Sequence, residues 1–219
     1  MIGALGFLET TGVTPAMAAI DAMLKAAAIR IFQLELNDLS GVCVKISGST
    51  ADVQTAIATG RAVAEQMQGQ PVSSVLTQVA ADAWPAIQSR NEFSPLIQQS
   101  VVFEPAEQPG AAAEISAAKP MTTLYMNQET PMALGFIETQ GFTAVFEAID
   151  TACKAASVEV VSKEKLGGGY VTVVIQGQLS AVSAAIDSGK EKVNGLGKLI
   201  AAHVIARPSE AVLKLLPKL

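Results

Sequence analysis

Basic side chains are too few in this 219-residue chain to form a surface for nucleic acid. Lysine and arginine together number 15 against 20 aspartates and glutamates, which gives a net charge of −5 and an isoelectric point near 4.9. A phosphate backbone is bound by a basic stripe or patch. The charge balance therefore argues against a nucleic-acid partner.

Cysteine and histidine are also scarce. The two cysteines, Cys43 and Cys153, do not suggest a disulfide framework, and we expect a reducing cytosol. The one histidine, His203, has no nucleophile pattern or metal-ligand spacing near it. We therefore assign no catalytic residue and expect no enzymatic activity.

Long apolar runs are lacking as well. Asp21, Lys25 and Arg30 interrupt the richest one, and no basic segment precedes the apolar residues at the N-terminus. We expect neither a membrane span nor a secretory signal. Half of the residues are hydrophobic but only 5% are aromatic. This surplus of small apolar residues suits close-packed subunit contacts better than a deep ligand pocket.

One stretch of the sequence occurs twice. ALGFLETTG at residues 4–12 returns as ALGFIETQG at 133–141, and the offset of 129 residues (133 minus 4) holds without a gap as far as Gly60 and Gly189. This register indicates two copies of one supersecondary unit, each large enough to be a small domain with its own core. We attribute the recurrence of Glu9 as Glu138 to duplication alone.

Residue patterning predicts the same order of elements in both copies. The first copy is expected to form strand 3–10, helix 16–28 capped by Thr14, strands 29–36 and 42–47, helix 50–66 capped by Ser49 or Thr50, strand 72–79 and helix 80–90. The second is expected to form strand 132–139, helix 143–156, strands 158–164 and 170–176, helix 180–193, strand 199–206 and helix 209–215.

The predicted fold class is α+β. Two tandem ferredoxin-like β-α-β-β-α-β domains should each form a four-stranded antiparallel sheet with helices on one face. We place these domains at residues 1–92 and 132–219. Residues 93–131 between them contain a Pro/Ala/Gly/Glu-rich linker.

The second copy closely resembles the bacterial microcompartment shell domain. The segments that carry this resemblance are residues 133–144, 148–150, 154–158, 163–172, 176–177 and 203–208. Both copies keep the β-first order, so the chain resembles the non-permuted tandem class, similar to the tandem shell protein of propanediol utilisation. The resemblance implies a homotrimer with pseudo-sixfold symmetry, located in a microcompartment shell in the bacterial cytoplasm. Hexameric and pentameric shell proteins would be its partners there.

The resemblance also implies a pore on the trimer axis, passing small polar metabolites and lined by the hairpin between the second and third strands. The lining residues would be Leu36, Asn37, Asp38, Leu39 and Ser40 in the first copy, and Lys165, Leu166, Gly167, Gly168 and Gly169 in the second. Three consecutive glycines allow the backbone to crowd an axis and present amide groups. We expect Asp38 and Leu39 to narrow and polarise the opening. The alternative is that both loops are ordinary hairpin turns.

Three residues match tile-edge positions of the family. Lys25 and Lys154 correspond to the edge lysine that pairs hexamers across a two-fold axis, and Arg207 to the edge arginine that docks into a neighbouring tile. The alternative for both lysines is a solvated ion pair with the aspartate four residues earlier. The first copy has Gln78 where the second has Arg207, so only half of the edges would carry the arginine.

The resemblance also raises the question of whether the chain carries an iron–sulfur cluster, because a tandem relative has a cysteine near its pore. Cys43 is the candidate, but it falls inside a predicted strand whose neighbours offer no second thiolate. We favour a small buried thiol and no cofactor, and we expect Cys153 to pack within its helix stripe. The alternatives are an electron-conducting, cluster-carrying shell protein and a ferredoxin-like regulator that binds a small ligand.

Overall fold

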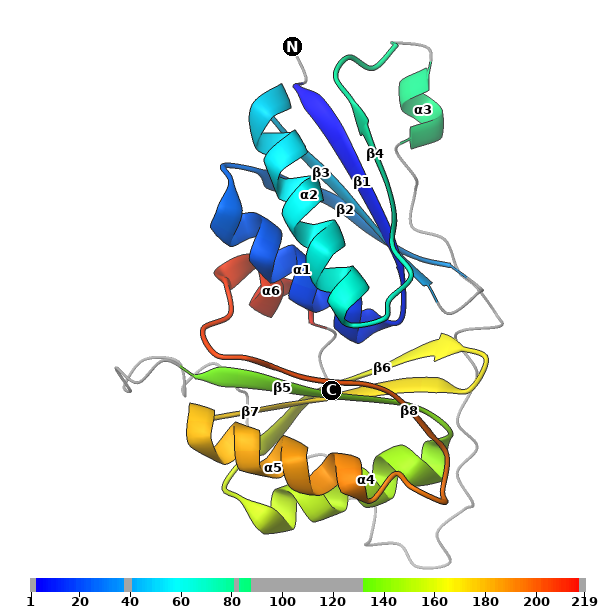
Figure 1. The fold of residues 1–219 in the computed structure, drawn as a ribbon, viewed down its shortest axis with the longest axis vertical. Helices are drawn as coiled ribbons and strands as arrows, with labels where there is room; N and C mark the ends of the chain where they lie inside the picture. The colour runs from blue at the N-terminus through cyan, green and yellow to red at the C-terminus, as the bar shows by residue number, and fades with distance from the viewer. Residues whose placement is uncertain (1–2, 38–40, 81–82, 88–131, 217–219) are drawn as a thin grey trace, which may run out of the picture.

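Two four-stranded antiparallel sheets, one from each repeat, form the framework of the molecule (Figure 1). The computed structural model describes residues 3–37, 41–80, 83–87 and 132–216. The strand orders are β2-β3-β1-β4 and β6-β7-β5-β8, so the same topology occurs twice. This arrangement confirms the predicted fold class. The predicted linker at 93–131 lies outside the described residues.

The elements of the first repeat follow the predicted order. They are β1 (Ala4–Thr11), α1 (Val13–Ala26), β2 (Arg30–Asn37), β3 (Gly41–Gly48), α2 (Thr50–Gln66), β4 (Val72–Leu76) and α3 (Trp84–Ile87). Helix α2 begins as predicted, because Ser49 accepts a hydrogen bond from the Asp52 backbone N–H. Of the predicted helix at 80–90, the structure describes Ala80 and residues 83–87, which include α3; the other positions lie outside the described residues.

The second repeat has the same elements in the same order. They are β5 (Ala133–Gln140), α4 (Phe142–Ala155), β6 (Glu159–Gly167), β7 (Tyr170–Gly177), α5 (Leu179–Glu191), β8 (Lys198–Ile205) and α6 (Glu210–Leu215). None of the described helices in either repeat has the length and apolar character needed to cross a bilayer.

In each domain a pair of helices covers one face of the sheet: α1 and α2 in the first, α4 and α5 in the second (Figure 1). Gly6 of β1 faces Val53 and Ile57 of α2. Because side chains alternate along a strand, Phe7 and Glu9 belong to the other face, called here the open face of the sheet.

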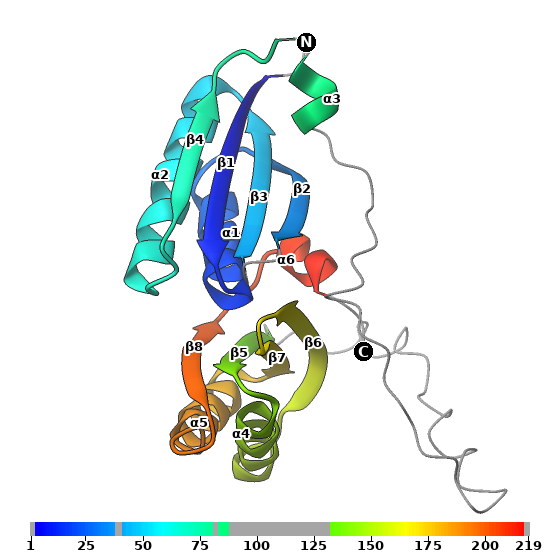
Figure 2. The same cartoon turned by 90° about the vertical axis from the view of Figure 1, so that its right-hand side faces the viewer.

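The two domains pack against each other through the open face of the second sheet. Leu134, Phe136 and Ile205 from that face belong to the same core cluster as residues of α1, including Ala16 and Met17. Figures 1 and 2 show the N-terminal end of α1 above the second sheet, with α6 returning beside the first domain. One apolar cluster therefore spans both domains, and the second domain has further clusters of its own.

The start of α1 differs from the prediction. The helix begins at Val13 after Gly12, which has φ 90° and ψ 152° and no side chain to act as a cap. Thr14, the predicted N-cap, lies inside the first turn and is buried. The prediction of a Thr14 cap was wrong because the group that binds the first N–H donors comes from the second domain, 125 positions away in sequence.

Candidate functional site

The first β2–β3 hairpin is described only in part. Leu36 lies near the end of β2 and is exposed, and Asn37 ends the strand. The other predicted pore residues of this loop, Asp38, Leu39 and Ser40, lie outside the described residues.

The second hairpin, between β6 and β7, is a glycine turn. Residues 167–169 have φ values of 83°, 57° and 80°, a region that side-chain-bearing residues rarely occupy. Carbonyl oxygens of the turn accept hydrogen bonds from the Gln140 side-chain amide (3.1 Å) and the Gly141 backbone N–H (2.8 Å). Lys165 is half-buried, and Leu166 packs into the core shared by the domains. The outer part of the turn is therefore mostly backbone.

The predicted edge residues lie at the surface. Lys25, in the last turn of α1, is ion-paired with Asp21, and Lys154, in the last turn of α4, is ion-paired with Asp150 at 2.5 Å. Arg207 is exposed in the bend after β8. Both lysine side chains remain at the surface in spite of their ion pairs. A residue of an adjoining molecule could therefore replace the aspartate as the partner of the lysine.

A carboxylate from the second domain binds the N-terminus of α1. Glu138 Oε1 accepts a hydrogen bond from the Val13 N–H (2.9 Å) and Oε2 accepts one from the Thr14 N–H (2.8 Å). Glu138 is fully buried. Its negative charge faces the positive end of the helix dipole, and it satisfies two of the four N–H donors that a helix leaves open. A Cβ atom on Gly12 would lie 3.0 Å from this carboxylate.

A second polar contact joins the other end of the same interface. Asp21 of α1 accepts a hydrogen bond from the Ser209 backbone N–H (2.9 Å), just before α6. Burial lowers the pKa of the nearby His203 imidazole, while the negative charge of Asp21 acts in the opposite direction. We call this contact surface between the two domains the interdomain joint. It extends along α1 from the first turn, which binds Glu138, to Asp21.

The interdomain joint encloses a small cavity of about 30 Å³. Ser162 Oγ and Thr172 Oγ1 are buried there without a hydrogen-bond partner among the described residues. Glu164 also lines the cavity, and burial raises the pKa of its carboxyl, with the N–H and charge of Lys165 opposing the shift. The other residues that line the cavity are apolar, so these two hydroxyls and the Glu164 carboxyl are polar groups in largely apolar surroundings.

We expect Glu164→Gln to stabilise the protein at neutral pH. A carboxyl whose pKa is raised on folding binds its proton more tightly in the native state, so its contribution is most favourable at low pH and is lost as pH rises above about 4.5. Thermal unfolding from pH 4 to pH 7 should show the difference between variant and wild type growing with pH. Glu147→Gln, at an exposed position of α4, is the control. A constant difference across this range would contradict the assignment.

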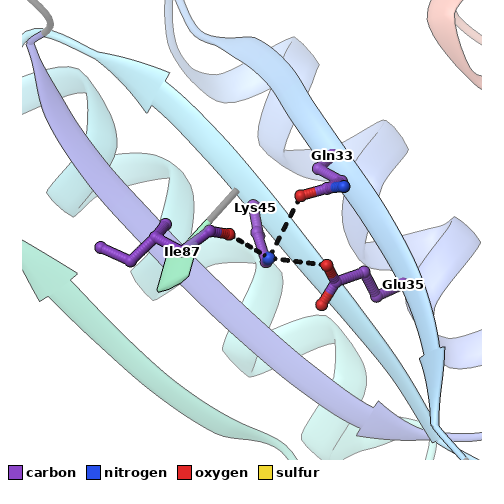
Figure 3. A network of polar contacts seen from close by, with 4 residues as sticks. All are labelled: Gln33, Glu35, Lys45 and Ile87. Atoms are coloured by element: carbon purple, nitrogen blue, oxygen red, sulfur yellow. Dashed lines mark hydrogen bonds and ion pairs between the residues drawn. The ribbon is translucent and has the colours of Figure 1, made fainter. Parts of the chain in front are cut away.

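The open face of the first sheet carries a buried lysine (Figure 3). Lys45 Nζ donates to Glu35 Oε1 (2.8 Å), Gln33 Oε1 (3.2 Å) and the Ile87 carbonyl (2.5 Å), so it ties α3 to the sheet. The ring centroids of Phe32 in β2 and Trp84 in α3 lie 5.3 Å apart. At the offset of 129 the counterpart of Lys45 is Val174, so this network belongs to the first domain alone.

The two cysteines differ in their exposure. Burial, and then the charge of Glu9, raise the pKa of the half-buried Cys43 thiol, which disfavours the thiolate that a cluster needs. No group of three metal-ligating side chains occurs within the described part of the chain. Cys153 is exposed, so the prediction that it packs within the helix stripe was wrong. It lies on the face of α4 that the rest of the molecule leaves uncovered.

Sequence reasoning missed Glu138 as a functional residue. Its recurrence was attributed to duplication. A carboxylate that lies in a strand, between apolar residues and a glycine turn, could have indicated a buried charged side chain. A charged side chain is almost never fully buried unless it is paired. That rule would have prompted a search for buried donors facing Glu138.

Comparison with known proteins finds relatives that match one repeat at a time. A model of the BMC domain matches residues 4–80 and again 133–208. The bacterial microcompartment shell protein PduA of Citrobacter freundii is 47% identical over 93 residues, covering 42% of this chain and 97% of that protein. The major carboxysome shell protein CsoS1A of Halothiobacillus neapolitanus is 45% identical over 94 residues, covering 42% of this chain and 96% of that protein. A crystal structure of a microcompartments protein from Desulfitobacterium hafniense DCB aligns over 98% of this chain and 99% of its own, with 23% identity and a TM-score of 0.37.

Proposed function

Because the chain belongs to the BMC-domain family, carries that domain twice and is a bacterial microcompartment shell protein, we propose that three copies form a ring of six domains that serves as a shell tile. The observation that carries this proposal is the interdomain joint. It fastens two consecutive family domains to each other through different surfaces, the open face of one sheet and the N-terminus of a helix. A contact of this head-to-tail kind closes into a ring when its rotation divides a full turn.

In this ring the hairpins would surround the axis and form a pore for small polar metabolites. The glycine turn at 167–169 would present backbone groups to the opening, alternating with the bulkier loop that carries Leu36, Asp38 and Leu39. Its two hydrogen bonds to the end of β5 support this role, because they hold the turn in one position.

The tile would act as a wall component with no catalytic role. Its relatives are shell proteins, and Lys25, Lys154 and Arg207 are at the surface where neighbouring hexameric or pentameric shell proteins would be met. The edge lysine is present in both repeats, as Lys25 in the first and Lys154 in the second. The edge arginine, Arg207, is present only in the second. The tile would therefore have two kinds of edge and select its neighbours within a mixed shell.

We expect Arg207→Ala to impair edge-to-edge packing and leave the trimer intact, because Arg207 is exposed and lies outside the interdomain joint. Native mass spectrometry should give three chains for both wild type and variant, and electron microscopy should show sheets for the wild type only. Arg61→Ala, which removes an exposed arginine from α2, is the control. A monomeric wild type would refute the proposed function, and loss of the trimer in Arg207→Ala would refute the edge assignment.

A further inference from the structure

A pocket of about 650 Å³ lies on the open face of the first sheet, at the end away from the β2–β3 hairpin. The start of β1, the start of β2, the end of β3 and α3 contribute to its lining, which includes Leu5, Arg30, Phe32, Ser47 and Trp84. None of the described pore or edge residues lines it. Its volume, and its mainly apolar lining with a few polar groups, are typical of a small-molecule site.

The pocket contains a positive charge that has no partner. Arg30 lies opposite Ser47 of β3, which in turn lies opposite Leu5 of β1, and this row belongs to the open face because the next residue, Gly6, faces α2. Arg30 is exposed, and no described residue holds its guanidinium in an ion pair or hydrogen bond. No acidic side chain is found among the described residues that line the pocket.

Two aromatic rings form the apolar wall beside this charge. Phe32 is the extra residue of a β-bulge in β2, a feature that redirects side chains. Its ring packs against that of Trp84 in α3. Both residues are half-buried, so part of each ring remains open to a ligand. The wall thus combines apolar surface with the hydrogen-bond donors of Arg30, Ser47 and the Trp84 indole.

The buried lysine network holds this wall in place. Lys45 Nζ donates to the Ile87 carbonyl in α3, while Glu35 and Gln33 bind the same Nζ from β2 (Figure 3). Helix α3 is only four residues long, so this bond and the ring contact with Phe32 are two attachments that position Trp84. Lys45 is therefore a positioning residue for the pocket.

The second repeat lacks these features. Five residues that form or support the pocket have counterparts of different chemistry at the offset of 129: Arg30 becomes Glu159, Phe32 becomes Val161, Lys45 becomes Val174, Ser47 becomes Gln176 and Trp84 becomes Leu213. The charge is reversed, and both rings and the lysine are missing. A structural role common to both domains therefore does not explain the residues of the pocket.

We propose that this pocket binds a small organic carboxylate, with its charged group on Arg30 and its apolar body against Phe32 and Trp84. A guanidinium binds a carboxylate through two parallel hydrogen bonds, and the adjacent Ser47 hydroxyl supplies another donor. A site with a cation, several donors and no acid selects an anion over a neutral or cationic molecule of the same shape. One chain builds the whole pocket, so the site does not depend on the proposed ring.

Benzoate is the probe, and two related molecules separate its parts. Benzamide has the same ring without the charge, and acetate has the charge without the ring. Trp84 is the only tryptophan of the chain, so its fluorescence reports directly on the pocket. We expect a saturable change with benzoate. Calorimetry should give dissociation constants at least about tenfold higher for benzamide and for acetate.

Variants of the full chain assign the binding to named residues. Arg30→Gln should raise the dissociation constant of benzoate at least about tenfold and leave that of benzamide unchanged, because it removes only the charge-assisted bonds. Lys45→Met, which releases α3, should weaken both ligands alike. Arg30 is exposed, so the unfolding temperature of Arg30→Gln should match the wild type. Arg61→Gln, on an exposed arginine of α2 outside the pocket, is the control.

The contrary results are equally specific. Benzoate binding that does not saturate, that persists in Arg30→Gln, or that is no tighter than benzamide binding would overturn the carboxylate site. Unchanged binding of both ligands in Lys45→Met would refute the positioning role of Lys45.

Discussion

Glu138→Ala is expected to lower the free energy of unfolding by about 3 kcal/mol, because each hydrogen bond to a charged group contributes roughly 1.5–3 kcal/mol and two buried donors lose their acceptor. The donors are the N–H groups of Val13 and Thr14, at 2.9 Å and 2.8 Å from the carboxylate oxygens. Chemical denaturation followed by circular dichroism measures the loss. Amide exchange should place its origin at the first turn of α1.

Two further variants separate the possible causes of this loss. Glu138→Gln keeps the length of the side chain and one acceptor oxygen, so it should lie between wild type and Glu138→Ala. Glu159→Ala, on an exposed glutamate of β6, should change the free energy of unfolding by less than about 0.5 kcal/mol. An effect of Glu138→Ala as small as that of Glu159→Ala would show that the bond to α1 does not stabilise the domain pair.

The order of elements could be predicted from the sequence because it depends on local patterns. The period-two alternation of Val42, Val44 and Ile46 gave a strand, and all three side chains are buried under the helices. The hydroxyl of Ser49 gave the start of α2. Each of these patterns extends over only a few residues, so the sequence of a single repeat is enough to predict its strands and helices.

The interdomain joint could not be predicted in the same way, because its partners are far apart in sequence. Thr14 was expected to cap α1, but the acceptor is Glu138. The bond from Lys45 to the Ile87 carbonyl likewise depends on where the chain returns after β4. Among the predicted pore and edge residues that the structure describes, Leu36, Lys25, Lys154 and Arg207 are exposed and Leu166 is buried. Their roles remain predictions that the ring experiments address.

The second large effect that we expect comes from substituting the glycine of the repeated ALGF motif. Gly135→Val should lower the free energy of unfolding by about 3 kcal/mol or more, near the upper end for an overpacked core. A Cβ atom on Gly135 would lie 2.7 Å from Val182, 2.8 Å from Ile186 and 2.9 Å from Ile175. All three neighbours are β-branched and stiff at χ1, so they cannot turn aside.

Gly195→Ala separates lack of space from backbone strain. Gly195 has φ 80°, and a Cβ atom there would meet no heavy atom of the described chain within 4 Å. Its cost should be about 1–2 kcal/mol, from the left-handed conformation alone. Gly135 is not among the positive-φ glycines, so its cost comes from α5 lying directly on β5. If Gly135→Val cost no more than Gly195→Ala in denaturation experiments, helix packing would not be the reason for a glycine here. The same distances recur at Gly6 with Ile57, Val53 and Ile46, so Gly6→Val should show an equal loss, and the motif then marks a close approach of helix to sheet in both domains.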